Sequence, residues 1–292
     1  MNICIVAGAR PNFIKVAPLI RAIERYQAQG NHKDLHYELI YSGRDDDPTL
    51  EDSLFNDLQI KKPTTYLGVD CANLNVLVGE VMAKFEHYLE EHPTDIVVVV
   101  DDLSSTMGVA IVTKKQGLVL AHIAAGTRSF DINMPKEINR LVIDGLSDIL
   151  FTAGMSNNSI ANREGAELSK VYMVGNILID NLRLLHNKLH RPKLMDQLGL
   201  KEGEYIVFTL NRKKLIADED NLHDMIAATC ESLKVNAVPV VAPVRDKAAI
   251  AIKKAMQGTD SDMKLVEPLG YLDFMYLTAH AKGIITDSGN VA

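Results

Sequence analysis

The chain has 292 residues, of which 47% are hydrophobic and 24% charged, and its 31 basic and 38 acidic side chains give a formal net charge of −7. This length favours two domains with sizeable cores, and the acidic balance excludes a broad basic surface for nucleic acid. The three cysteines are far apart and lack C-x-x-C spacing, so they predict neither a disulfide framework nor a zinc site.

Short β-branched runs alternate with longer helical patterns from the first residues onward. The run 96–100 is five consecutive β-branched residues, which is typical of a strand buried on both faces of a parallel sheet. The first half predicts strands at 3–6, 37–41, 96–100, 118–123 and 149–151, with helices after residue 11 and at 50–58, 74–91, 141–146 and 157–167. The second half predicts strands at 206–208, 238–241, 265–266 and 284–285, with helices at 220–233, 247–256 and 271–281.

This alternation predicts an α/β protein with two doubly wound, parallel-sheet, Rossmann-like domains. We place the N-terminal domain at 1–172 and the C-terminal domain at 173–292. The last predicted strand leads into Asp-Ser-Gly at 287–289, where a helix should begin, so we expect the second domain to be incomplete. No leader pattern or long apolar run is present, and we expect a cytoplasmic protein without a membrane span.

Polar and basic side chains follow several of the predicted strands. In open parallel sheets, ligands bind beyond the carboxyl ends of the strands, and arginine forks suit the oxygens of phosphates. The helix starts after Gly8 and Gly289 would add backbone donors for an anion. Taken singly, each arginine fits a solvated surface ion pair better than a ligand site. Together they favour a ligand with a diphosphate, and the basic residues at these strand ends are Arg10, Lys15, Arg128, Arg140 and Arg212.

Six motifs, in order along the whole chain, carry a resemblance to one family. They lie at 8–19, 125–129, 135–140, 174–180, 268–272 and 286–289. With these motifs the chain resembles the non-hydrolysing UDP-N-acetylglucosamine 2-epimerases. The resemblance implies a glycosyltransferase-B-like arrangement of two Rossmann domains, with UDP or a UDP-sugar as ligand. It also implies a homodimer formed through N-terminal-domain helices and a place in polysaccharide biosynthesis.

The reaction implied by the resemblance inverts C2 of UDP-GlcNAc to give UDP-ManNAc. UDP is eliminated across C1–C2 and is then added back on the other face, which needs an acid and a base at C2 but no metal or redox cofactor. Family positions carried onto this chain give Asp102, Lys15 and Glu137 as catalytic residues. The implied substrate-binding residues are Arg10, Arg128, Arg140, Asn211, Arg212, Phe274, Ser288 and Gly289. Phe274, expected near the uracil, fits a helix core position equally well.

Departures from the family fall in the implied site. A catalytic glutamate of the family is Ala124 here, a second carboxylate is Lys136, and a histidine is Asn211. A Glu-Glu pair expected shortly after 288–289 is beyond the last residue. Alanine carries no proton and Asn does not titrate, so we expect impaired acid–base chemistry.

Two functional hypotheses therefore stay open. The first is an impaired 2-epimerase that uses Asp101 or Asp102 as its base. The second is a non-catalytic scaffold of the same family that binds a UDP-sugar or a protein partner. His122, next to the altered loop, is either a hydrogen-bonded core residue or a site group. The run 45–47 of three aspartates fits a turn and helix cap better than a cation site.

Overall fold

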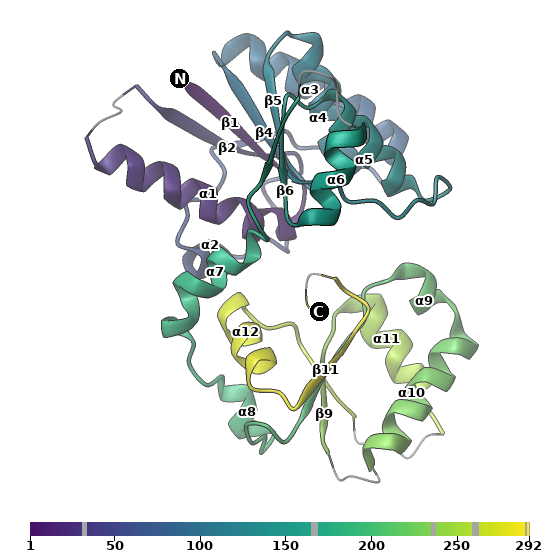
Figure 1. Ribbon diagram of the computed structural model, residues 1–292. Helices are drawn as coiled ribbons and strands as arrows, with labels where there is room; N and C mark the ends of the chain where they lie inside the picture. Colours follow the sequence, from purple (N-terminus) through teal and green to yellow (C-terminus); the bar gives the residue numbers. More distant parts are fainter. Residues whose placement is uncertain (31–33, 165–168, 235–237, 259–262, 290, 292) are drawn as a thin grey trace. The chain divides into compact units, whose positions relative to one another are not determined.

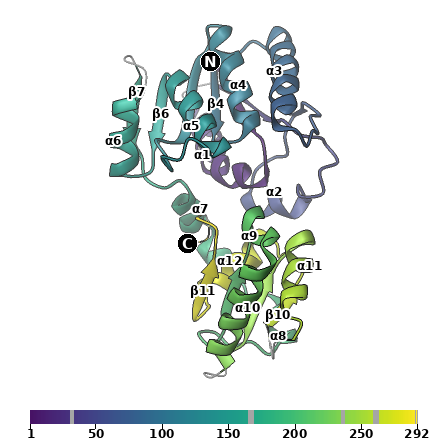
Figure 2. The ribbon, with the colours of Figure 1, turned by 90° about the vertical axis from the view of Figure 1, so that its right-hand side faces the viewer.

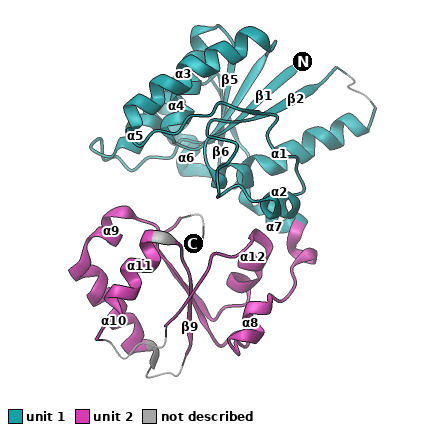
Figure 3. Cartoon of the chain, turned by 180° about the vertical axis from the view of Figure 1, so that it is seen from behind, with its two compact units in different colours: residues 1–184 teal, residues 185–292 magenta. Residues whose placement is uncertain are grey.

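The computed structural model describes residues 1–30, 34–164, 169–234, 238–258, 263–289 and 291. It divides into two compact units, Met1–Leu184 and Leu185–Ala292 (Figure 3). The division falls later than the boundary predicted after residue 172, and helix α7 (Leu178–Leu185) ends at it. The buried Asn181 side chain in α7 donates to the carbonyl of Ile14 at 2.5 Å and accepts from Arg21 at 2.6 Å.

Unit 1 is built on a parallel sheet whose strands, among the described residues, follow the order β3-β2-β1-β4-β5-β6-β7. The order reverses between β1 and β4, which places the switch point of the sheet between these two strands. The strands are β1 (Asn2–Ala7), β2 (His36–Tyr41), β3 (Thr65–Tyr66), β4 (Ile96–Val100), β5 (Val119–Ala125), β6 (Ile149–Thr152) and β7 (Lys170–Met173).

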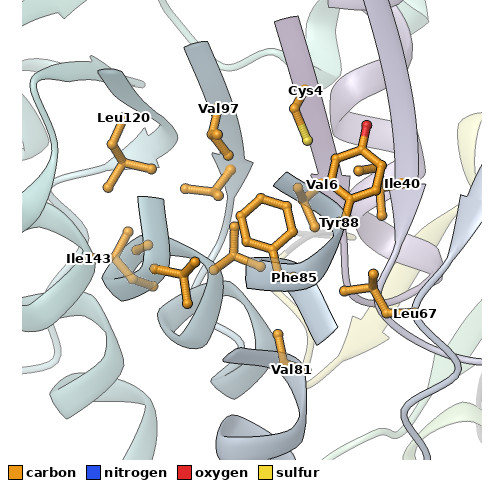
Figure 4. Close-up of a cluster of buried hydrophobic side chains, with 14 of the residues drawn as sticks. Cys4, Val6, Ile40, Leu67, Val81, Phe85, Tyr88, Val97, Leu120 and Ile143 are labelled. Carbon is orange, nitrogen blue, oxygen red and sulfur yellow. The ribbon is translucent and has the colours of Figure 1, made fainter. Parts of the chain in front are cut away.

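Helices cover both faces of this sheet. Helix α1 lies on one face, and α3, α4 and α5 lie on the other (Figures 1 and 2). Alternate residues of β1 and β4 point into the core beneath α3 and α4, where Cys4, Val6 and Val97 lie around Phe85 (Figure 4), and Val99 belongs to the same cluster. The helices of the unit before α7 are α1 (Arg10–Ala28), α2 (Asp52–Leu58), α3 (Leu74–Glu91), α4 (Ser104–Lys115), α5 (Pro135–Leu146) and α6 (Met155–Glu164).

Unit 2 has a parallel sheet in the order β10-β9-β8-β11, with its switch point between β8 and β11. Its strands are β8 (Ile206–Thr209), β9 (Val240–Pro243), β10 (Met263–Val266) and β11 (Gly283–Thr286). Its helices are α8 (Lys193–Gln197), α9 (Lys213–Ala217), α10 (Glu219–Lys234), α11 (Asp246–Ala255) and α12 (Tyr271–Ala279), and a 3-10 turn spans His186–Lys188. Cores lie on both faces of the sheet.

The two faces of the unit 2 sheet bury different helices. Phe208 packs with Ile226 of α10 and Ile252 of α11 on one face, while Val207 packs with Met195 of α8 and Leu277 of α12 on the other. The predicted fold class, two doubly wound parallel α/β units, is therefore confirmed. Among the described residues, no helix is both long and apolar enough to cross a bilayer.

Candidate functional site

The switch point of unit 1 brings the loops after β1 and β4 together, because these two strands are paired. Such a crevice is where doubly wound sheets bind ligands. The two loops lie close to each other: a Cβ added at Gly8 would lie 2.3 Å from the Oγ of Ser105 at the start of α4. A side chain at position 8 would therefore require the Ser105 hydroxyl to move, and glycine avoids this contact.

Asp101, the first residue after β4, has a left-handed backbone with φ of 61°. Its carboxylate accepts from the Nζ of Lys15 at 2.5 Å and from the Nδ2 of Asn12 at 2.9 Å. Asn12 also accepts, through its Oδ1, from the backbone N–H of Gly8 at 2.8 Å. One buried amide therefore ties the β1 loop to the β4 loop. Lys15, predicted to be catalytic, contacts Asp101 here.

Asp102 is held by two cations from α5. Arg140 approaches one carboxylate oxygen with its Nε at 2.8 Å and its Nη2 at 2.7 Å, while the Nζ of Lys136 lies 3.2 Å from the other. Asn139 donates to the backbone carbonyl of Asp102 at 2.9 Å. Since only 15% of the Asp102 side chain is exposed, these contacts cover most of the carboxylate.

Glu137 is buried at the base of the loop that follows β5. Its carboxylate accepts from the backbone N–H and the hydroxyl of Ser129, both at 2.9 Å, from the N–H of Phe130 at 3.0 Å and from Arg140 at 2.9 Å. Burial alone would raise the pKa of Glu137, but these hydrogen bonds outweigh it and lower the pKa to about 2. Glu137 is therefore ionised near neutral pH and organises the loop.

Arg128 and Ala124 lie on either side of Gly126. The Arg128 side chain is only 2% exposed, and its donors face the carboxylates of Asp144 at 2.6 Å and Glu164 at 2.9 Å. Arg128, predicted to bind a phosphate, is thus held in a buried ion-pair network. Ala124 has a left-handed backbone with φ of 67°, an uncommon conformation for a residue with a side chain.

A cavity of about 490 Å³ adjoins this switch point at the carboxyl ends of β1 and β2. Gly8, Tyr41, Asp47 and Asp70 are among its lining residues. The hydroxyl of Tyr41 donates to Asp47 at 2.5 Å, and Asp47 also accepts from the backbone N–H of Thr49 at 2.8 Å. The aspartate run therefore forms a turn, although the cap of α2 is Glu51.

The switch point of unit 2 is organised by a carboxylate as well. Asp287, directly after β11, accepts from the backbone N–H groups of Asn211 at 2.9 Å and Arg212 at 2.6 Å. The N–H of Ser288 donates to the Oγ1 of Thr286 at 3.0 Å. These hydrogen bonds join two strand-end loops. The loops carry the predicted substrate-binding residues Asn211, Arg212, Ser288 and Gly289.

The remaining predicted residues lie on helices. Arg10 is the first residue of α1, at the carboxyl end of β1. Phe274 lies on α12 and packs, partly buried, against the core that contains Tyr205 and Leu277. In the part of the chain that the structure describes, no group of three or more His, Cys, Asp or Glu side chains is arranged to hold a metal ion.

His122 and Asp144 form the buried centre of unit 1's site, and the sequence pattern does not single out Asp144. The Nδ1 of His122 lies 2.7 Å from the Oδ1 of Asp144, and its Nε2 lies 3.0 Å from the backbone carbonyl of Asp101. A usable signal exists in the sequence: Asp144 directly follows Ile143 on the buried side of α5, where an unpaired acid would be costly.

Two doubly wound units, each with charged loops at its switch point, define a protein of the glycosyltransferase-B-like fold class. Residues 27–292 match the model of the family described as UDP-N-acetylglucosamine 2-epimerase, and the chain belongs to this family. The family resemblance predicted from the six motifs is thereby confirmed.

Several known proteins are similar over the full chain. A UDP-N-acetylglucosamine 2-epimerase homolog from Methanococcus maripaludis is 32% identical, with 100% of this chain and 80% of that protein covered. The UDP-N-acetylglucosamine 2-epimerase of Methanocaldococcus jannaschii is 28% identical, with the same two coverages. A crystal structure of the Methanocaldococcus jannaschii enzyme in complex with UDP-GlcNAc and UDP has a TM-score of 0.82 at 26% identity, covering 100% of this chain and 80% of that one.

Proposed function

We propose that this protein binds a UDP-sugar and catalyses, at a reduced rate, the 2-epimerase reaction of its family. The observation that carries the proposal is the placement of Asp102, with its two cationic partners, at the switch point of unit 1. The similar Methanocaldococcus jannaschii enzyme has been crystallised with UDP-GlcNAc and UDP, which supports the same ligand class for this chain.

The reaction needs few groups, and the chain retains some of them. A base takes the C2 proton while the C1–O bond breaks and UDP leaves as the anion, which gives a C1–C2 double bond; an acid then delivers a proton to the opposite face of C2 and UDP adds back to C1, so the configuration at C2 is inverted. We assign the base role to Asp102, with Arg140 and Lys136 balancing its charge. We assign UDP binding to the loops of Asn211 and Arg212 and of Ser288 and Gly289, with Arg10 as a further cation.

Reduced turnover follows from the groups that cannot exchange a proton. Ala124 has no acidic side chain, and the amide of Asn211 does not titrate near neutral pH. Glu137 has a pKa lowered to about 2 and four donors on its carboxylate, so it is a poor acid near pH 7. Loss of several acid–base groups costs orders of magnitude in rate, although such losses do not add.

The second candidate is a non-catalytic UDP-sugar-binding or protein-interaction scaffold. It is favoured by the contacts of Asp102, because both of its carboxylate oxygens already face cations of the protein. A base paired so closely would have to exchange a partner for the substrate. We also propose, from the family, a cytoplasmic homodimer that acts in polysaccharide biosynthesis.

One experiment separates the two candidates. Incubation with UDP-GlcNAc in deuterated water, followed by NMR, reports solvent exchange at C2, and calorimetry reports UDP binding in parallel. Exchange together with binding supports the enzyme, and saturable binding without exchange leaves only the scaffold. Absence of both excludes the enzyme and the UDP-sugar-binding scaffold, and leaves only the protein-interaction scaffold. The variant Ala124→Glu/Lys136→Glu/Asn211→His should raise the exchange rate if those three positions limit catalysis.

A further inference from the structure

The ring of His122 is buried on β5, with 2% of the residue exposed, and both of its nitrogens face oxygen acceptors. Nδ1 faces a carboxylate oxygen of Asp144 at 2.7 Å, and Nε2 faces the main-chain carbonyl oxygen of Asp101 at 3.0 Å. A neutral imidazole donates from one nitrogen only, whereas the doubly protonated ring donates from both. The geometry therefore matches an imidazolium.

The surrounding charges favour the same state. Burial would raise the pKa of Asp144, but hydrogen bonds and charge from His122 and Arg128 lower it, so Asp144 is a carboxylate. Its second oxygen accepts from Arg128 at 2.6 Å and from the N–H of Gly126 at 3.0 Å. Arg128 in turn contacts Glu164. Glu164 also pairs with Arg163 at 2.8 Å, and the negative charge that faces the His122 ring directly is that of Asp144.

His122 is linked to the candidate site through the backbone of Asp101. That residue has φ of 61°, a left-handed conformation that is uncommon for residues with a side chain. The His122 ring holds its carbonyl, and Lys15 and Asn12 hold its carboxylate. Asp102 follows directly in the chain, so the contacts that hold Asp101 also determine the position of the Asp102 carboxylate.

We propose that His122, as a doubly protonated imidazolium anchored by Asp144, is a positioning residue that fixes the Asp101 carbonyl and thereby sets the placement of the Asp102 carboxylate. The consequence for turnover rests on the proposed function, whereas the protonation state and the placement of the turn do not. His122 touches no reacting atom in this proposal; it acts on the ligand through Asp101 and Asp102.

The protonation state is tested on the wild-type chain without any ligand. In protein labelled with ¹⁵N in histidine, the His122 ring, assigned by triple-resonance NMR, should show two protonated nitrogens near neutral pH. A ring with one protonated and one bare nitrogen would overturn the proposal. This measurement needs no activity and no variant, so it is unaffected if the proposed reaction is absent.

The positioning role is tested with two amides of different length. Gln at position 122 reaches far enough to replace the donor at Nε2, whereas Asn replaces only the donor at Nδ1. The backbone amide resonances of Asp101 and Asp102 should move in His122→Asn and stay close to wild type in His122→Gln. Equal perturbation by both variants, or by neither, in folded protein would overturn the positioning role.

The same pair of variants separates this inference from the proposed function. If the wild type exchanges C2, His122→Asn should lose about tenfold or more in rate at saturating UDP-GlcNAc, with UDP affinity within about twofold, and His122→Gln should recover most of the loss. Equal rates in both variants would contradict the inference. If the wild type shows no exchange, the proposed reaction fails, and the two NMR measurements still decide the role of His122.

Discussion

The ammonium group of Lys136 lies 3.2 Å from the Oδ1 of Asp102 on the side opposite Arg140's contact with Oδ2. Of these two cations, Lys136 is 57% exposed and Arg140 only 16%. The pair with Lys136 is therefore solvated and weak, while the pair with Arg140 is largely withdrawn from water. A ligand can displace Lys136 from Asp102 much more easily than it can displace Arg140.

Arg140 should contribute strongly to the stability of unit 1. Its guanidinium bridges the carboxylates of Asp102 and Glu137, so Arg140→Met leaves two mostly buried anions without their shared cation. We expect a loss of about 3 kcal/mol in the free energy of unfolding, measured by urea denaturation. The control is Lys62→Met, which breaks an exposed pair with Asp52 and should cost less than about 1 kcal/mol. Equal losses would contradict this difference.

Glu137 should make unit 1 sensitive to acid. Its pKa falls from 4.5 to about 2 on folding, so its carboxylate contributes stability that is fully present above the unfolded-state pKa and is lost as pH drops toward 2. The shift corresponds to about 3 kcal/mol. Glu137→Gln should therefore be less stable than wild type at pH 7, with the difference shrinking as denaturation is repeated at pH 5, 4 and 3. A difference that stays constant over this range would rule out the linkage.

Gly126 should tolerate no side chain. It has φ of 73°, and a Cβ there would lie 2.1 Å from the backbone oxygen of Asn157. Gly117 is the matched control, because it has φ of 74° and open space around the added atom. Gly117→Ala should cost about 1 kcal/mol from backbone strain alone, and Gly126→Ala clearly more. Denaturation curves of the two variants should separate the clash from the strain, and coinciding curves would refute the clash.

Asp287 should matter for UDP binding although it acts through the backbone. Asp287→Asn replaces the carboxylate that accepts from the N–H groups of Asn211 and Arg212 and so loosens their loop. We expect the affinity for UDP, measured by calorimetry, to fall about tenfold. Glu204→Gln is the control, because Glu204 lies before the start of β8, whereas Asn211 and Arg212 follow the end of that strand. Unchanged affinity in the Asp287 variant would remove this assignment.

Local sequence pattern predicts many of the buried elements, although the buried helix α4 (Ser104–Lys115) is absent from the prediction. The strand predicted at 96–100 is β4 (Ile96–Val100), and the helix predicted at 74–91 is α3 (Leu74–Glu91), because continuous burial and a capped amphipathic helix both leave clear patterns. The short β3 and the largely exposed β7 are absent from the prediction. Neither strand is a long apolar run, and both are formed by pairing with a neighbouring strand.

The contacts in the site are harder to predict from the sequence than the fold is. Residue type and position predict that Arg128 and Arg140 lie at strand ends, but not that Arg128 faces Asp144 whereas Arg140 faces Asp102. Which anion a cation meets depends on the tertiary placement of α5 and α6, and spacing along the chain does not encode it. Ion pairing of this kind is a property of the packed structure.

The separate cores of the two units have a thermodynamic consequence. The cluster around Phe85 belongs wholly to unit 1, and the clusters around Phe208 and Tyr205 belong wholly to unit 2. Chains with independent cores need not melt as one cooperative system. We therefore expect a calorimetric scan to show two transitions, and a ligand held by the loops of one unit to raise the midpoint of that unit's transition first. The stability of this protein is then given by two free energies of unfolding, one for each unit. A substitution changes the value of the unit that contains it.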